Sequence, residues 1–356
     1  TNYPPSDGVP VMREAVIDLY RRTLGLDYPV ESVAIFGGAR PAIYGTYRAI
    51  VAPGERVIYS TPSWNNNHYV RLSDAVAVEC DTSAEEGFMP TAQQLRPLLP
   101  GARLLCLNSP LNPTGTVIDQ DELRRICELV IEENRRRQRS GEKTLYVMYD
   151  QVYYALTFGD TKHYTPPELC PEMAAYTIFV DAISKSLCAT GLRVGWAVAP
   201  PYVMSRMRDI LGHVGAWAPR PEQIATAAIL KDADSLSSFQ VAMNREVEQR
   251  LSLLYEGIRT LQAAGLPVRA IPPQGAIYLS AQFDLRGRKL PDGTVVTTNE
   301  QVRNYLLHAA GMAVVPFQAF GMRAETGWMR LSVGAVSLAD ITALLPRLRE
   351  ALTAVS

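Results

Sequence analysis

One lysine in this sequence lies where a side-chain amine could react with a carbonyl compound. Lys185 follows the apolar run 177–180 in a stretch of small residues, and Arg193 comes eight residues later. An amine that leaves a buried strand can be placed among groups that lower its pKa, and the unprotonated amine is the reactive form. Lys185 is therefore a candidate Schiff-base lysine. The alternative is an ordinary surface lysine after a strand, so the rest of the chain must decide.

Other polar or aromatic residues share this position relative to predicted strands. Between residues 56 and 195, apolar runs alternate with helical patterns. Continuous apolar strands separated by helices are typical of a mostly parallel sheet that is covered on both faces. Ligands bind beyond the carboxyl ends of such strands. We therefore expect one crevice to contain the residues that follow four of these runs, namely Trp64, Asn112, Asp150 and Lys185.

The chain divides into three parts by composition and pattern. Residues 1–10 form a proline-rich, extended start, and residues 11–240 carry the alternating strands and helices. Residues 241–356 contain short strands around predicted helices at 298–310 and 338–353, as in a separate, smaller α+β domain. The boundary near residue 240 is expected on a long helix.

Composition excludes several classes of function. The 356 residues include 35 Lys and Arg against 36 Asp and Glu, so neither nucleic acid nor a membrane is expected as a partner. The basic run 135–139 ends a helical pattern and is expected to form a solvated face. Four scattered histidines show no metal-ligand spacing. Five dispersed cysteines without a C-x-x-C pair favour a reducing, cytoplasmic location.

Pyridoxal phosphate satisfies the chemistry of the residues named so far. It has an aldehyde for Lys185, a flat ring for Trp64 and a ring nitrogen that Asp150 could keep protonated. Its phosphate suits Arg193 and the turn 38–40, where glycine precedes a predicted helix, although such turns also occur for steric reasons alone. A nicotinamide cofactor lacks the aldehyde. Its usual G-x-G-x-x-G turn is also absent after the first strand.

The motifs and their order resemble the class I/II aminotransferases, which are fold type I pyridoxal-phosphate enzymes. The resemblance runs from Tyr3 to the C-terminus and rests on Ser-Lys before Gly-Leu-Arg-Val-Gly at 191–195, Asn-Pro-Thr-Gly at 112–115, Asp150 with Tyr153, and Arg330 in Met-Arg-Leu-Ser-Val-Gly. It implies a large α/β domain with a mostly parallel, seven-stranded sheet covered by helices and a smaller C-terminal α+β domain.

The resemblance also implies roles for the matching residues. Lys185 forms the Schiff base and moves the substrate proton, and Asp150 pairs with the ring nitrogen. Arg330 binds the substrate carboxylate through a two-pronged contact, where the alternative is a plain sheet arginine. Trp64 contacts the cofactor ring and the substrate. Asn112 and Tyr153 contact the ring 3-oxygen, and Asn112 also faces the substrate. The phosphate is bound by Gly38, Ala39, Arg40 and Arg193.

The N-terminal segment carries a further implication of the resemblance. Tyr3 matches a tyrosine that reaches the phosphate of the neighbouring subunit, which implies a homodimer with shared active sites; an exposed start needs no such role. The family normally has several tens of residues upstream, including an arm that crosses to the partner. We expect that these are omitted from the sequence rather than lacking in the protein.

The sequence departs from the family pattern at Ala182. Three residues before the lysine the family usually has serine or threonine, whose hydroxyl binds the phosphate. A hydrogen bond to a charged group, about 1.5–3 kcal/mol, is then missing or replaced by water or by Ser184. The cationic side chain of Arg40 could also compensate or face solvent.

The resulting hypothesis is an aminotransferase that moves an amino group between an amino acid and a 2-oxo acid. Another fold type I reaction, such as β-elimination, decarboxylation or a related lyase reaction, uses the same residues and stays open. A regulatory, effector-sensing module is a third possibility, but it usually requires a fused DNA-binding domain. The residue pattern does not determine the amino-acid side chain.

Overall fold

A seven-stranded sheet forms the centre of the larger lobe. The computed structural model describes residues 2–356, so Thr1 of the predicted segment 1–10 lies outside the described residues. The strand order is β1-β7-β6-β5-β4-β2-β3, and only the contacts of β7 with β6 and β1 are antiparallel. The predicted fold class is confirmed. The strands are β1 (Val33–Phe36), β2 (Arg56–Thr61), β3 (Val76–Asp81), β4 (Ala102–Asn108), β5 (Tyr146–Asp150), β6 (Thr177–Ala182) and β7 (Gly195–Val198).

Helices cover both faces of this sheet, as continuous apolar strands require. Alternate residues of β1 show the division, because Val33 and Ile35 belong to one core cluster and Ala34 and Phe36 to the other. The first cluster includes side chains of α1 (Pro10–Leu24), α5 (Gln120–Ser140) and α9 (Arg220–Lys231), and the second those of α2 (Ala39–Ile50) and α8 (Pro201–Val214). Shorter helices are α3 (Asn66–Leu72), α4 (Ala92–Leu95), α6 (Pro166–Leu169) and α7 (Ile183–Ser186).

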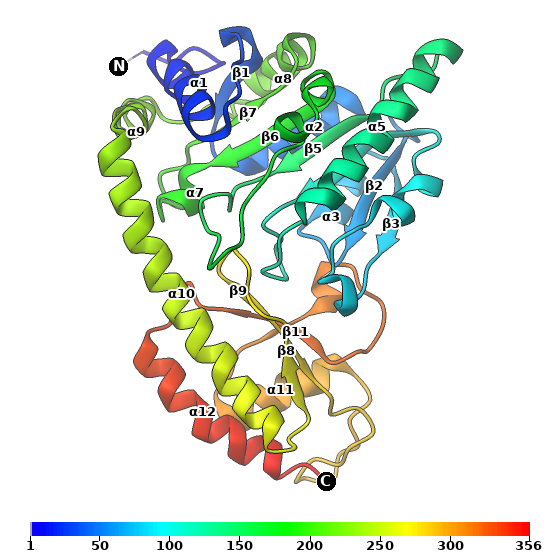
Figure 1. Ribbon diagram of the computed structural model, residues 1–356, viewed down its shortest axis with the longest axis vertical. Helices are drawn as coiled ribbons and strands as arrows, with labels where there is room; N and C mark the ends of the chain where they lie inside the picture. Colours follow the sequence, from blue (N-terminus) through cyan, green and yellow to red (C-terminus); the bar gives the residue numbers. More distant parts are fainter. Residues whose placement is uncertain (1) are drawn as a thin grey trace.

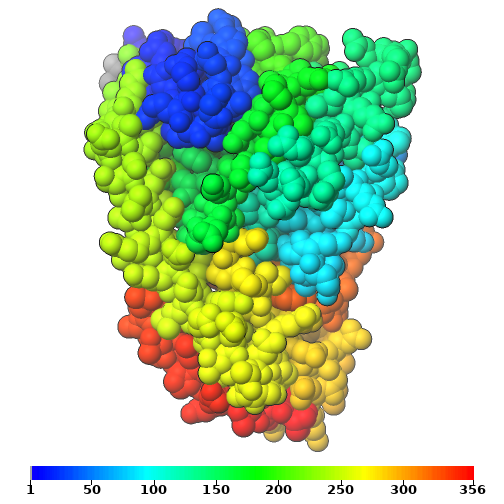
Figure 2. Space-filling view, in the orientation of Figure 1, coloured from blue at the N-terminus to red at the C-terminus, as the bar shows by residue number. Residues whose placement is uncertain are grey.

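The smaller lobe is built on an antiparallel sheet in the order β10-β11-β9-β8. It has its own core cluster, and it lies directly beneath the larger lobe in the space-filling view (Figure 2). The elements are β8 (Val268–Ala270), β9 (Tyr278–Phe283), β10 (Val315–Pro316), β11 (Trp328–Ser332), α11 (Asn299–Ala310) and α12 (Leu338–Thr353).

The long helix α10 (Ala233–Ala263) runs along both lobes (Figure 1). Its N-cap is Asp232, which separates α10 from the preceding helix α9. Leu236 packs in the core of the larger lobe, whereas Met243 packs in that of the smaller lobe. The predicted boundary between 240 and 241 falls in this interval and stays a prediction. Within residues 2–356, none of the helices is long and apolar enough to cross a membrane.

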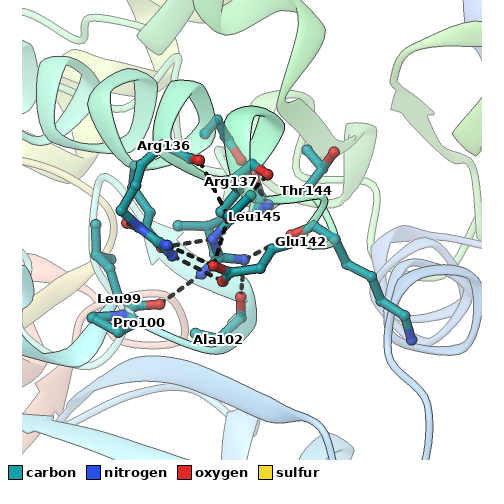
Figure 3. A network of polar contacts seen from close by, with 12 residues as sticks. Leu99, Pro100, Ala102, Arg136, Arg137, Glu142, Thr144 and Leu145 are labelled. Carbon is teal, nitrogen blue, oxygen red and sulfur yellow. Dashed lines mark hydrogen bonds and ion pairs between the residues drawn. The ribbon is translucent and has the colours of Figure 1, made fainter.

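The end of α5 corrects one prediction, because the basic run 135–139 is not wholly solvated. Arg137 is buried, and its guanidinium donates to Glu133 at 2.7 Å. It also donates to three backbone oxygens, those of Leu99, Ala102 and Lys143 (Figure 3). Arg137 thereby ties α5 to the segments that lead into β4 and β5. Buried arginine needs this many acceptors, and they come from residues that no local pattern connects.

Candidate active site

The predicted residues meet in a pocket of about 580 Å³ between the two lobes. Strands β2, β4, β5 and β6 end at this pocket, and β9 and β11 contribute one side chain each from the smaller lobe. Of the predicted residues, the pocket is lined by Ala39, Arg40, Trp64, Asn112, Asp150, Tyr153, Lys185, Arg193 and Arg330. Gly38 lies next to this lining, and Tyr3 lies elsewhere.

Lys185 lies on the short helix α7. The small residues around it are more typical of a loop. Its Nζ is 5.7 Å from the centre of the Tyr153 ring. Burial lowers the pKa of Lys185, and the positive charges of Arg330 and Arg40 lower this pKa further, while Cys188 acts in the opposite direction. The surroundings therefore favour the neutral, nucleophilic amine.

Asp150 is the last residue of β5 and its side chain is buried. The Val152 N–H donates to its Oδ1 at 3.2 Å, and no ion pair with Asp150 is found among residues 2–356. Burial raises the pKa of Asp150 to about 7, and the Val152 hydrogen bond offsets part of this effect. A buried carboxylate without a cation suits a ligand that brings one, such as a protonated ring nitrogen. This observation supports the fit of the pocket to pyridoxal phosphate.

The N-terminus of α2 and Arg193 form the end of the pocket that could hold a phosphate. Gly38 is the N-cap of α2 with φ 101°, and a Cβ at this position would collide with the Arg193 guanidinium. That guanidinium donates to the backbone oxygens of Gly37 at 2.9 Å and Thr190 at 2.7 Å. Free helix N–H groups beside an arginine attract an anion. Ser184 and Thr190 also line the pocket here, whereas Ala182 is buried and adds no hydroxyl.

Asn112 is held by residues of both lobes. Its N–H donates to Asn108 Oδ1 at 2.9 Å, and Asn108 Nδ2 donates to the backbone oxygen of Asp150 at 2.8 Å. From the smaller lobe, Arg330 Nη1 donates to Asn112 Oδ1 at 3.1 Å. Among residues 2–356 the side-chain nitrogen Nδ2 of Asn112 has no hydrogen-bond partner, so it is available for a ligand in the pocket.

Arg330 enters the pocket from β11 with two aromatic neighbours. Its Cζ is 4.8 Å from the ring centre of Tyr278 and 4.9 Å from that of Phe320. Among residues 2–356 its buried Nε has no hydrogen-bond partner and the side chain makes no ion pair. A guanidinium with an unused donor is suited to a carboxylate that accepts two hydrogen bonds.

Trp64 and Arg40 form another wall of the pocket. Trp64 is partly buried and contacts Phe320, with 6.3 Å between ring centres. The Arg40 guanidinium is 5.6 Å from the Trp64 ring centre and is exposed. No ion pair of Arg40 occurs within residues 2–356. The backbone of Arg40 is part of the first turn of α2, while its side chain adds a free positive charge to the pocket.

Tyr153 and Tyr3 differ in their position relative to the pocket. Tyr153 lines the pocket, and its neighbour Tyr154 does not. Tyr3 is 85% exposed and contacts Trp217 with ring centres 5.8 Å apart. Its predicted contact with the phosphate of a neighbouring subunit stays a prediction.

Several lining residues escaped the sequence analysis. Asn108 could have been found as the last residue of its strand, in the same way as Asp150. Tyr278 had no such signal, because it lies within a strand of the smaller lobe and reaches the pocket only through the packing of the lobes. Its hydroxyl lies 2.7 Å from that of Tyr153. The other lining residues without a predicted role are Ile43, Val152 and Thr190, whereas Ser184 was considered only as a replacement for the hydroxyl missing at Ala182.

Comparison with known families decides the class of protein. The statistical description of the family "aminotransferase class I and II" matches residues 1–348. The chain belongs to this family. The match confirms the predicted family and the predicted enzyme class, an aminotransferase. Pyridoxal phosphate is the usual cofactor of class I and II aminotransferases.

Several bacterial proteins are similar to this aminotransferase. A probable aspartate/prephenate aminotransferase of Thermus aquaticus is 32% identical over 327 residues, which cover 90% of this chain and 78% of the relative. The aspartate aminotransferase of Geobacillus stearothermophilus is 30% identical, with coverage of 90% and 77%. The crystal structure of the aspartate aminotransferase from Rhizobium meliloti superimposes with a TM-score of 0.89 at 26% identity, covering 100% of this chain and 85% of that one.

Proposed function

We propose that this aminotransferase uses pyridoxal phosphate to move the amino group of an acidic amino acid, aspartate in the first place, to a 2-oxo acid. The observation that carries the choice of substrate is the pair Arg330 and Arg40. Both line the pocket, and neither is neutralised by a carboxylate within residues 2–356. A substrate with two carboxylates would pair with both. Relatives that bear the name aspartate aminotransferase support the same choice.

The residues of the pocket would divide the work by position. Bound pyridoxal phosphate would supply an electron sink for the electrons left at the substrate α-carbon. Lys185 would hold the cofactor and then take the α-proton and return it, which its lowered pKa favours. Asp150 would face the ring nitrogen and Trp64 the ring. Phosphate binding would fall to Arg193 and the N–H groups of Gly38, Ala39 and Arg40.

Hydrogen-bonding groups would orient the two ligands relative to one another. Asn112 and Tyr153 would contact the 3-oxygen of the cofactor, and Arg330 would bind the α-carboxylate of the substrate. The Arg40 side chain would take the second carboxylate, while its backbone N–H serves the phosphate. No observation favours elimination, decarboxylation or a regulatory role over amino transfer.

A homodimer with shared sites and a cytoplasmic location belong to the same proposal. Tyr3 supports the dimer, since its exposed ring is available to a second subunit. All five cysteines are free, which suits a reducing compartment.

A substrate panel with purified holoenzyme tests the proposal. Aspartate should be processed with a kcat/KM at least about 10-fold above that of alanine, because a charge-assisted contact contributes about 1.5–3 kcal/mol. Arg40→Gln should remove this preference and lower kcat/KM for alanine much less than for aspartate. Arg48→Gln, on the same helix but outside the pocket, is the matched control. If no amino acid converts the cofactor to its aminated form, amino transfer is the wrong reaction.

A further inference from the structure

Tyr278 touches two of the residues that the proposed reaction needs. Its hydroxyl lies 2.7 Å from the Tyr153 hydroxyl, and its ring centre lies 4.8 Å from Arg330 Cζ. Tyr153 follows β5 in the larger lobe, whereas Tyr278 and Arg330 lie on β9 and β11 of the smaller lobe. Tyr278 therefore connects a group assigned to the cofactor with the group assigned to the substrate carboxylate.

Strand register explains why Tyr278 and Arg330 meet. Arg330 pairs with Ser280, and Ser332 pairs with Tyr278, in the antiparallel contact of β11 with β9. Side chains two positions apart on neighbouring strands lie diagonally on the same face of a sheet, within reach of an aromatic ring. The contact is thus set by the sheet and does not depend on a loop.

The hydroxyl pair has one arrangement that serves the site. Tyr153 has a single hydroxyl proton, so it can donate either to Tyr278 or to a ligand in the pocket. If Tyr278 donates to Tyr153, the Tyr153 proton is free to point at a ligand oxygen. A hydrogen bond from Tyr278 to Tyr153 also makes the Tyr153 hydroxyl a better donor, because successive hydrogen bonds polarise one another. Both tyrosines are buried residues.

The ring of Tyr278 acts on the other partner. A guanidinium beside an aromatic face is held by attraction to the ring and by packing. Because the Arg330 Nε has no hydrogen-bond partner among residues 2–356, contacts with the two aromatic rings and with Asn112 hold this side chain toward the pocket.

We propose that Tyr278 is a positioning residue for amino transfer, whose hydroxyl orients the Tyr153 hydroxyl and whose ring orients the Arg330 guanidinium. The inference rests on the proposed function, since it assigns Tyr153 to the cofactor and Arg330 to the substrate. The side chain of Tyr278 thus has two actions, one through its hydroxyl and one through its ring. A substitution can remove the hydroxyl and keep the ring.

The first test is Tyr278→Phe, which keeps the ring and removes the hydroxyl. We expect the dissociation constant of pyridoxal phosphate from the cofactor-free protein, measured by tryptophan fluorescence, to rise about three- to tenfold. The absorption of the bound cofactor is expected to change with pH, and the midpoint of this change should move to higher pH in the variant. A weaker donor at the 3-oxygen of the cofactor leaves more negative charge there, which favours the protonated form. Binding of succinate, an unreactive dicarboxylate, should change less than about twofold.

The second test is Tyr278→Leu, which also removes the ring. Succinate binding to the holoenzyme should now weaken about three- to tenfold, as expected for the loss of a cation–aromatic contact. Tyr305→Phe is the matched control, because Tyr305 also donates its hydroxyl within the smaller lobe, to the Ala351 oxygen at 2.7 Å, but lies outside the pocket. It should leave all three measurements unchanged.

The outcomes distinguish the two levels of the proposal. If wild-type protein binds no pyridoxal phosphate, the proposed function itself fails. If wild-type protein is loaded and active but Tyr278→Phe shows neither weaker cofactor binding nor a shifted pH midpoint, the role of the hydroxyl is refuted. Unchanged succinate binding in Tyr278→Leu would refute the role of the ring.

Discussion

Arg330 Nη1 and Asn112 Oδ1 are joined by a hydrogen bond of 3.1 Å between residues 218 positions apart in the chain. Arg330 belongs to the sheet of the smaller lobe, and Asn112 follows β4 of the larger lobe. The bond occupies one side of the guanidinium, and the Nε has no hydrogen-bond partner among residues 2–356. Packing of the two lobes therefore creates the arrangement to which we assign the substrate carboxylate, and neither lobe has this arrangement alone.

Arg330→Lys should weaken substrate binding more than it slows turnover. Lysine keeps the charge but cannot form two parallel hydrogen bonds to a carboxylate while also reaching Asn112. We expect the KM for aspartate to rise about 10- to 100-fold, which corresponds to the loss of one charge-assisted hydrogen bond. Steady-state kinetics measure the effect. Arg323→Lys, an exposed arginine paired with Glu79, is the control, and equal KM values in both variants would contradict the assignment.

Lys185→Ala should leave the fold intact and abolish turnover. The side chain lines the pocket and has no ion-pair partner within residues 2–356, so circular dichroism should match the wild type. Loss of a group that moves the substrate proton costs about 10²- to 10⁴-fold, apart from its role in holding the cofactor. The exposed Lys143, paired with Glu55, provides a control as Lys143→Ala. Transamination near the wild-type rate in Lys185→Ala would end the assignment.

Asp150 should make the stability of the cofactor-free protein depend on pH. Its pKa is about 7 in the folded protein against about 3.9 in an unfolded chain, so its ionisation removes stability as pH rises between these values. Asparagine cannot ionise. Between pH 5 and pH 8, Asp150→Asn should therefore lose about 2–3 kcal/mol less free energy of unfolding than the wild type. Urea denaturation of both proteins at the two pH values measures this, and a difference that does not vary with pH would be inconsistent with a raised pKa.

Arg137→Met should destabilise the larger lobe. Arg137 is buried and donates to Glu133 and to three backbone oxygens, all of which would lose a partner. Breaking one side of a buried ion pair costs about 3–5 kcal/mol. The free energy of unfolding by urea should fall by that amount, whereas Arg139→Met, at an exposed position of the same helix, should change it by less than about 0.5 kcal/mol. A loss below about 1 kcal/mol for Arg137→Met would show that water replaces the guanidinium.

Much of the pocket could be predicted from local patterns. Trp64, Asn112, Asp150 and Lys185 each follow a strand whose apolar run is readable in the chain, and parallel strands bring such positions to one edge. The seven-stranded sheet and the antiparallel sheet of the smaller lobe agree with the expected fold class. The apolar run 177–180 is only part of β6 (Thr177–Ala182), because ladder pairing and not composition decides where a strand ends.

The amino-acid sequence by itself determined the order of the elements, the residues at the strand ends and the family motifs, because these depend on spacing along the chain. Only the tertiary structure decided that Arg137 is buried, that Asp150 forms no ion pair among residues 2–356 and that Tyr278 contacts both Tyr153 and Arg330. The reason is physical: burial, desolvation and hydrogen bonds between the lobes arise from segments far apart in the chain, and periodicity carries no information about which of them meet.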